Sequence, residues 1–138
     1  MNNIRMAEDY ARRAKRYLSE AESALLDGDG ATCVRRSQEA LELAAKAALR
    51  RLGIEYPREH DVSEAMDATA VRLPEYLRSR LEEVKALLVE LAGVRGPAFY
   101  GYEAEGIPAS QAFTSEYATE TLSRTRPLVD LCVKFATE

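Results

Sequence analysis

Apolar residues recur along this chain at intervals of three and four, the spacing of helices that bury one side. No segment shows the strict alternation of apolar and polar residues that is typical of a strand. The pattern predicts five helices, over residues 3–27, 31–52, 62–71, 77–102 and 114–136, and Pro74 is suited to the first turn of the fourth. The predicted fold is therefore all-α, an antiparallel bundle of four long helices plus one short helix in a single domain of residues 1–138.

The longest apolar stripe follows the central helix and ends in an arginine. At 100° per residue its members share a narrow arc: Leu77, Leu81, Val84, Leu88, Leu91 and Arg95. A guanidinium at the place of the next core residue must leave the core, find a partner or face a groove. The following sequence, GPAFYGY, combines two glycines and a proline with three aromatic rings, and we expect a break or kink at Gly96 and Pro97.

Other helix ends carry recognisable signals. Asp29 or Gly30 is suited to cap the second helix, and Gly53 to end it. Asp61 and Glu64 have the spacing of a capping box for the short helix.

Two late segments depart from a regular helix. Residues 103–113 contain glycine, proline and serine and are predicted to form a surface loop. Thr114 or Ser115 is suited to cap the last helix, which we expect Pro127 to kink after about Arg124.

Composition limits the class of protein. The chain has 138 residues, of which 46% are hydrophobic, and is long enough to bury a core without a metal or disulfide. Cys33 and Cys132 lie far apart without metal-ligand spacing, which indicates a reducing, cytoplasmic setting. No apolar run has the length of a signal peptide or a membrane span, and no motif indicates a metal or cofactor.

The charge pattern argues against a protein that coats nucleic acid, because the net charge is -4. A local basic group nevertheless occurs in the first two helices. It comprises Arg5, Arg12, Arg13, Lys15, Arg16, Arg35 and Arg36. Neighbouring carboxylates favour the interpretation that this is a solvated helix face.

Several short segments together resemble the HEPN domain family, helical bundles of prokaryotes and higher eukaryotes. They are SQEALELAAKA in the second helix, His60-Asp61-Val62, Arg95 followed by Tyr100-Gly101, Ile107-Pro108 and the helix start at Thr114. The resemblance covers nearly the whole chain.

The resemblance implies several functions. Many HEPN proteins are homodimers similar to metal-independent ribonucleases, with an Arg-x4-6-His motif at the dimer cleft. Others bind nucleotides, or pair with a minimal nucleotidyltransferase as toxin and antitoxin. The motif of that paired subgroup, Arg-x4-His-x-Tyr, aligns with Arg95, Tyr100 and Tyr102, and implies that Tyr102 is the residue modified with AMP.

The motif histidine is replaced by Tyr100, which changes the chemistry. Histidine serves as acid and base near neutrality because its pKa is ~6.5. Tyrosine, with a pKa of ~10, is a poor base there. The remaining histidine, His60, belongs to another helix entrance and is interpreted as a local hydrogen-bonding residue.

Three hypotheses follow. The first is a homodimeric module that binds a nucleotide or RNA through Arg95, Tyr100 and Tyr102, or that partners a minimal nucleotidyltransferase. The second is a ribonuclease toxin with Arg95 and Tyr100 as candidate catalytic residues. The third is a helical adaptor without a ligand. The replaced histidine favours the first.

Overall fold

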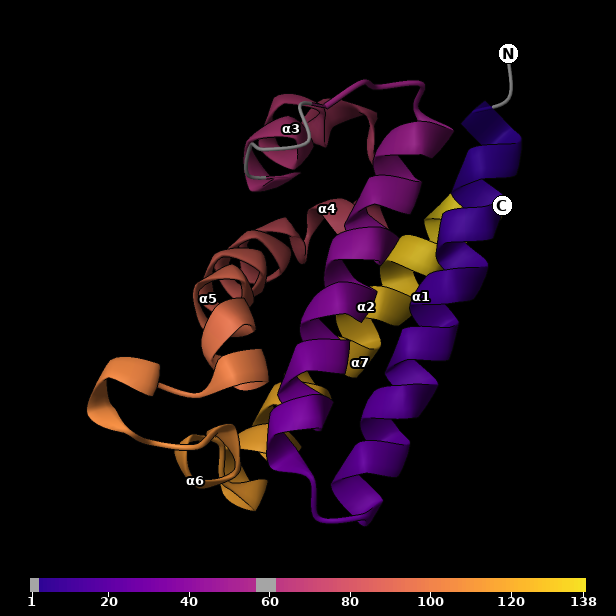
Figure 1. The fold of residues 1–138 in the computed structure, drawn as a ribbon. Helices are drawn as coiled ribbons and strands as arrows, with labels where there is room; N and C mark the ends of the chain where they lie inside the picture. Colours follow the sequence, from indigo (N-terminus) through magenta and orange to yellow (C-terminus); the bar gives the residue numbers. More distant parts are fainter. Residues whose placement is uncertain (1–2, 57–61) are drawn as a thin grey trace.

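Four long helices form the body of the molecule (Figure 1). The structure is a computed structural model that describes residues 3–56 and 62–138. The long helices are α1 (Asn3–Leu26), α2 (Gly30–Arg51), α5 (Leu81–Tyr100) and α7 (Ser115–Ala136). The shorter elements are α3 (Val62–Ala68), the 3-10 helix η1 (Ala70–Arg72), α4 (Glu75–Arg78), the 3-10 helix η2 (Glu103–Glu105) and α6 (Ala109–Ala112). The all-α prediction is confirmed, although the described residues contain more than the one short helix that was predicted.

Helix α2 is the central element of the bundle. It contacts α1, α5 and α7, and the four long helices alternate in direction in chain order (Figure 1). Consequently α2 is antiparallel to α1 and α5, but it runs in the same direction as α7. A row of small residues on α2, including Ala40, Ala44 and Ala48, is fully buried and allows close packing.

The ends of α2 follow the predicted capping signals. The Asp29 carboxylate accepts a hydrogen bond from the backbone N–H of Thr32 at 3.1 Å. At the other end Gly53 has a φ of 74°, and the N–H of Ile54 donates to the carbonyl of Leu49 at 3.0 Å. This is a Schellman ending, which favours glycine at the left-handed position.

Helix α7 also begins as predicted. The Thr114 hydroxyl accepts from the N–H of Tyr117 at 3.1 Å. The helix continues through Pro127 without interruption. The predicted capping box of Asp61 lies outside the described residues, and residues 103–113 contain η2 and α6 rather than loop alone.

The apolar stripe of the central region is buried as predicted, but it does not belong to one helix. Its five apolar members are all buried: Leu77, Leu81, Val84, Leu88 and Leu91. Helix α4 ends at Arg78 and α5 begins at Leu81, so the prediction of one continuous helix from residue 77 is wrong. At the junction the N–H of Arg80 donates to the carbonyl of Leu77 at 3.1 Å, a three-residue spacing that ends the α-helical pattern.

Candidate functional site

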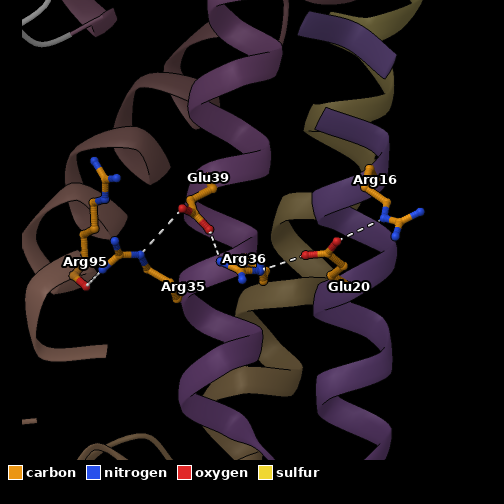
Figure 2. Close-up of polar contacts among 6 residues, drawn as sticks. All are labelled: Arg16, Glu20, Arg35, Arg36, Glu39 and Arg95. Atoms are coloured by element: carbon orange, nitrogen blue, oxygen red, sulfur yellow. Dashed lines mark hydrogen bonds and ion pairs between the residues drawn. The ribbon is translucent and has the colours of Figure 1, made fainter. Parts of the chain in front are cut away.

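Arg95 leaves the core, as the stripe required. The residue is exposed, and after Leu91 the next buried position of α5 is Ala98. Its carbonyl oxygen accepts a hydrogen bond from Nη1 of Arg35 at 2.8 Å, and Figure 2 shows its side chain pointing away from that contact. The Arg95 guanidinium makes no hydrogen bond or ion pair with the described residues. It therefore remains available to an anion.

The Arg95 side chain borders a groove between α1, α2 and the segment that follows α2. The groove has a volume of about 490 Å³ and is lined by Tyr10, Arg13, Glu42, Leu43, Lys46, Arg50, Tyr56 and Arg95. Four of these residues are cationic and one is anionic. The single carboxylate, on Glu42, is held by Lys46 at 3.1 Å. The groove therefore carries an excess of positive charge in a protein whose net charge is -4.

Beside the groove, ion pairs join α1 to α2, and a hydrogen bond to a backbone carbonyl joins α2 to α5 (Figure 2). Arg36 donates to Glu20 at 2.9 Å and to Glu39 at 2.6 Å, and so joins α1 to α2. The Nε atom of Arg35 lies 3.8 Å from the Glu39 carboxylate, and its Nη1 atom donates a hydrogen bond to the carbonyl oxygen of Arg95 on α5. These contacts hold the C-terminal third of α5 against α2. They also confirm that much of the basic group in the first two helices is paired with carboxylates.

Tyr100 does not join Arg95. Helix α5 runs unbroken through Gly96 and Pro97, so the break expected there does not occur. Because the helix is continuous, a separation of five residues places Arg95 and Tyr100 about 140° apart around its axis. The Tyr100 side chain is 63% exposed and meets the ring of Phe99 edge to face at 4.6 Å.

Tyr102 lies beyond the end of α5. Helix α5 ends at Tyr100 and is capped by Gly101, whose φ of 74° and close approach to the carbonyl of Ile107 leave no room for a side chain. Tyr102 exchanges two backbone hydrogen bonds with Ile107, of 2.8 and 3.0 Å, and its ring stacks on Phe113 at 6.5 Å. Its side chain is held in place but 40% exposed.

Part of the outer side of α5 is apolar and is not covered by the described residues. Val89 and Phe99 are 55% and 61% exposed. A side chain added at Gly93 or Gly96 would meet no atom within 4 Å. This side of the helix thus has the small and apolar residues of an interface without a covering element among the described residues.

The electrostatics of the groove favour donors rather than bases. Burial raises the pKa of the Tyr56 phenol, against the opposing effect of the neighbouring Arg50 guanidinium. Hydrogen bonding to Tyr56 in turn raises the pKa of Arg50. At neutral pH Tyr56 is therefore a neutral hydroxyl donor and Arg50 is a full cation. The sole histidine, His60, lies outside the described residues.

Sequence reasoning identified Arg95 but missed most of the groove. Gln38, Glu42 and Lys46 lie at steps of four residues along one stripe of α2, and the side chains of Gln38 and Lys46 donate to the Glu42 carboxylate at 3.0 and 3.1 Å. One more step of four residues along the same stripe reaches Arg50, so this spacing could have identified Arg50 as a residue of the groove. Tyr10 and Tyr56 come from other elements, and no local pattern connects them.

Two further properties concern the residues that the structure describes. No group of three or more histidine, cysteine, aspartate or glutamate side chains in this part of the chain is arranged to hold a metal ion. None of its helices combines the length and apolar character needed to cross a membrane.

Comparison with known proteins gives a consistent result for the fold. The structure is similar to that of the protein TT1696 from Thermus thermophilus, with a TM-score of 0.66 and 21% sequence identity over 98% of this chain and 99% of that one. No curated protein matches the sequence. The family model of the HEPN domain matches residues 7–135. The chain therefore belongs to the HEPN domain family.

Proposed function

We propose that the protein is a cytoplasmic, homodimeric HEPN module that binds a nucleotide or RNA, with Arg95 as the main phosphate contact. One observation carries this proposal: an exposed guanidinium without a partner among the described residues lies at the edge of a groove rich in positive charge. Arginine is well suited to phosphate because its planar donors form paired hydrogen bonds.

The uncovered side of α5 supports a dimer. Val89, Gly93 and Gly96 offer apolar area, and the glycines allow a second helix to approach closely. The exposed Phe99 ring lies at the edge of this area, 5.0 Å from the Arg35 guanidinium. Within one chain Arg95 and Tyr100 point apart. In the proposed dimer the two copies pack through α5, so that Arg95 of one copy and the tyrosines of the other line one cleft.

RNA binding and oligomeric state test this proposal together. We expect sedimentation to show a dimer and fluorescence anisotropy to show binding of a short RNA. Arg95→Ala is expected to weaken RNA binding by at least about tenfold, because a charge-assisted hydrogen-bond pair is lost. Arg126→Ala removes an exposed arginine of α7 that lies outside the groove, and it should change binding less than about twofold. A monomer, or equal binding by wild type and Arg95→Ala, contradicts the proposal.

A second candidate function is partnership with a minimal nucleotidyltransferase of a toxin-antitoxin pair. Its support is Tyr102, whose ring is held by Phe113 while its hydroxyl makes no hydrogen bond with the described residues. Mass spectrometry of protein co-expressed with an adjacent nucleotidyltransferase should find AMP on Tyr102, and Tyr102→Phe should abolish the adduct. An adduct on the more exposed Tyr100 instead would contradict this assignment.

Ribonuclease activity is the alternative for the same cleft. It requires Arg95 and Tyr100 to act together, whereas one chain holds them about 140° apart around α5. Cleavage of RNA without metal by the wild type, lost in Arg95→Ala, would favour this alternative. The adaptor hypothesis predicts instead that added nucleotides leave the melting temperature unchanged.

A further inference from the structure

The groove beside Arg95 contains recognition groups that the dimer cleft does not use. Arg13, Arg50 and the phenols of Tyr10 and Tyr56 line it from α1, from the last turn of α2 and from the segment after α2. All of them belong to one chain, so these groups are brought together without a second copy.

The charges in the groove are only partly compensated. Lys46 is paired with Glu42 at 3.1 Å, and Arg13 lies 3.8 Å from Asp9 outside the groove. Arg50 and Arg95 have no carboxylate partner among the described residues. In addition, the Nε atom of Arg50 is buried and lacks a hydrogen-bond acceptor in the described part of the molecule. Because this atom is buried, it is not accessible from the groove. The positive charges of Arg50 and Arg95 nevertheless lack a balancing carboxylate there, and an anion in the groove would supply that balance.

Of the two tyrosine rings that line the groove, that of Tyr56 already lies against two cations. The Tyr56 ring lies 5.5 Å from Nζ of Lys46 and 5.5 Å from Cζ of Arg50. These contacts fix the ring and direct the side chains around it, but they make it a poor platform for a nucleobase. The Tyr56 ring therefore does not favour a base, whereas the cations of the groove favour phosphate oxygens.

The size of the groove limits the ligand. A volume of about 490 Å³ falls within the range of small-molecule sites, roughly 300–1,000 Å³, and exceeds what a single inorganic anion fills. We propose that this groove is a binding site, complete within one subunit, for the phosphate group of a small phosphomonoester, with Arg13, Arg50, Arg95, Tyr10 and Tyr56 as its donors. The inference deepens the proposed function, because it places a phosphate of the ligand within one protomer.

Isothermal titration calorimetry with three probes tests the site. AMP and ribose 5-phosphate should bind with dissociation constants within about threefold of each other, and adenosine should not bind measurably, because recognition depends on the phosphate. Arg50→Gln should weaken AMP binding by at least about tenfold. Arg13 is an exposed residue of α1, so Arg13→Gln keeps the fold and should show a loss in the same direction. Arg126→Gln has the same change of net charge outside the groove and should bind AMP within about twofold of wild type.

The results separate this inference from the proposed function. Two results would contradict the inference that the groove binds phosphate: binding of adenosine as tight as that of AMP, or an equal loss of affinity for AMP in Arg50→Gln and Arg126→Gln. If Arg95→Ala loses RNA binding while Arg50→Gln and Arg13→Gln bind AMP as tightly as wild type, the proposed function is supported and the phosphate site in the groove is excluded. If the protein is monomeric and does not bind RNA, but its binding of AMP depends on Arg50 and Arg13, the phosphate site in the groove is supported and the proposed function is wrong.

Discussion

Two sets of small residues in this protein have opposite surroundings. Where α1, α2 and α7 meet, four alanines are buried together, namely Ala7, Ala11, Ala47 and Ala136. On the outer side of α5, Ala86, Ala92, Gly93 and Gly96 are exposed. Both sets give a helix a surface that another helix can approach closely, but only the first is covered by the described chain. The comparison shows that a row of small residues predicts close packing without identifying the helix that packs there.

The largest difference in stability is expected between substitutions on the buried side and on the exposed side of α5. Leu91 is buried, and Leu91→Ala should lower the free energy of unfolding by about 2–5 kcal/mol through lost burial and a cavity. Val89 is 55% exposed on the same helix, and Val89→Ala should cost no more than about 0.5 kcal/mol. Urea denaturation measures both. Equal losses would show that the two sides of α5 are not distinct in the subunit.

The next largest difference in stability is expected when a small residue of each set is replaced by a larger one. Ala47 is fully buried, and Ala47→Leu should destabilise the fold by about 1–3 kcal/mol because the helices cannot separate without strain. The matched change on α5, Ala92→Leu, places the same atoms in solvent and should alter subunit stability by less than about 0.5 kcal/mol. The midpoint of urea unfolding reports both changes. A stable Ala47→Leu protein would contradict the tight packing of α1, α2 and α7.

A smaller effect of opposite sign is expected at Gly93. An added methyl group meets no atom within 4 Å, so Gly93→Ala should stabilise the subunit by about 1 kcal/mol through helix propensity. Thermal unfolding at a concentration where the protein is monomeric measures this gain. If a second copy approaches α5 closely at this glycine, the same variant should weaken the dimer in sedimentation experiments. A gain in stability with an unchanged dimer would place the second copy elsewhere.

The smallest effect is expected at the edge between the two sides of α5. Arg124 of α7 donates to Glu90 at 3.0 and 3.1 Å, with both side chains about two-fifths exposed. Arg124→Gln should cost only about 0.2–1 kcal/mol, because exposed ion pairs are screened by solvent. The difference from wild type in urea midpoint should shrink further as salt is raised from low to molar concentration. A loss as large as that of Leu91→Ala would mean that this pair, rather than the apolar side, holds α5.

Local patterns predicted much of the fold. The spacing of apolar residues located the four long helices, and short-range hydrogen-bonding signals located their ends at Asp29, Gly53 and Thr114. The division between α4 and α5 was missed because Leu77 and Leu81 keep the helical spacing across a turn, so the pattern is the same with or without it. The candidate site was predicted only in part. Arg95 stood out because a charge interrupted an apolar stripe, whereas Tyr10, Arg50 and Tyr56 share no interval in the sequence.

The sequence by itself determined which faces of each helix are apolar, where the helices are capped, and that a guanidinium occupies the next place of the central apolar stripe. These features depend on neighbours within one or two turns. Only the tertiary structure decided that Arg95 faces a groove shared with α1 and α2, that Tyr100 points away from it, and that the described residues leave the outer side of α5 uncovered. Those outcomes depend on how helices distant in the chain lie against one another. The periodicity of a single helix contains no information about that arrangement.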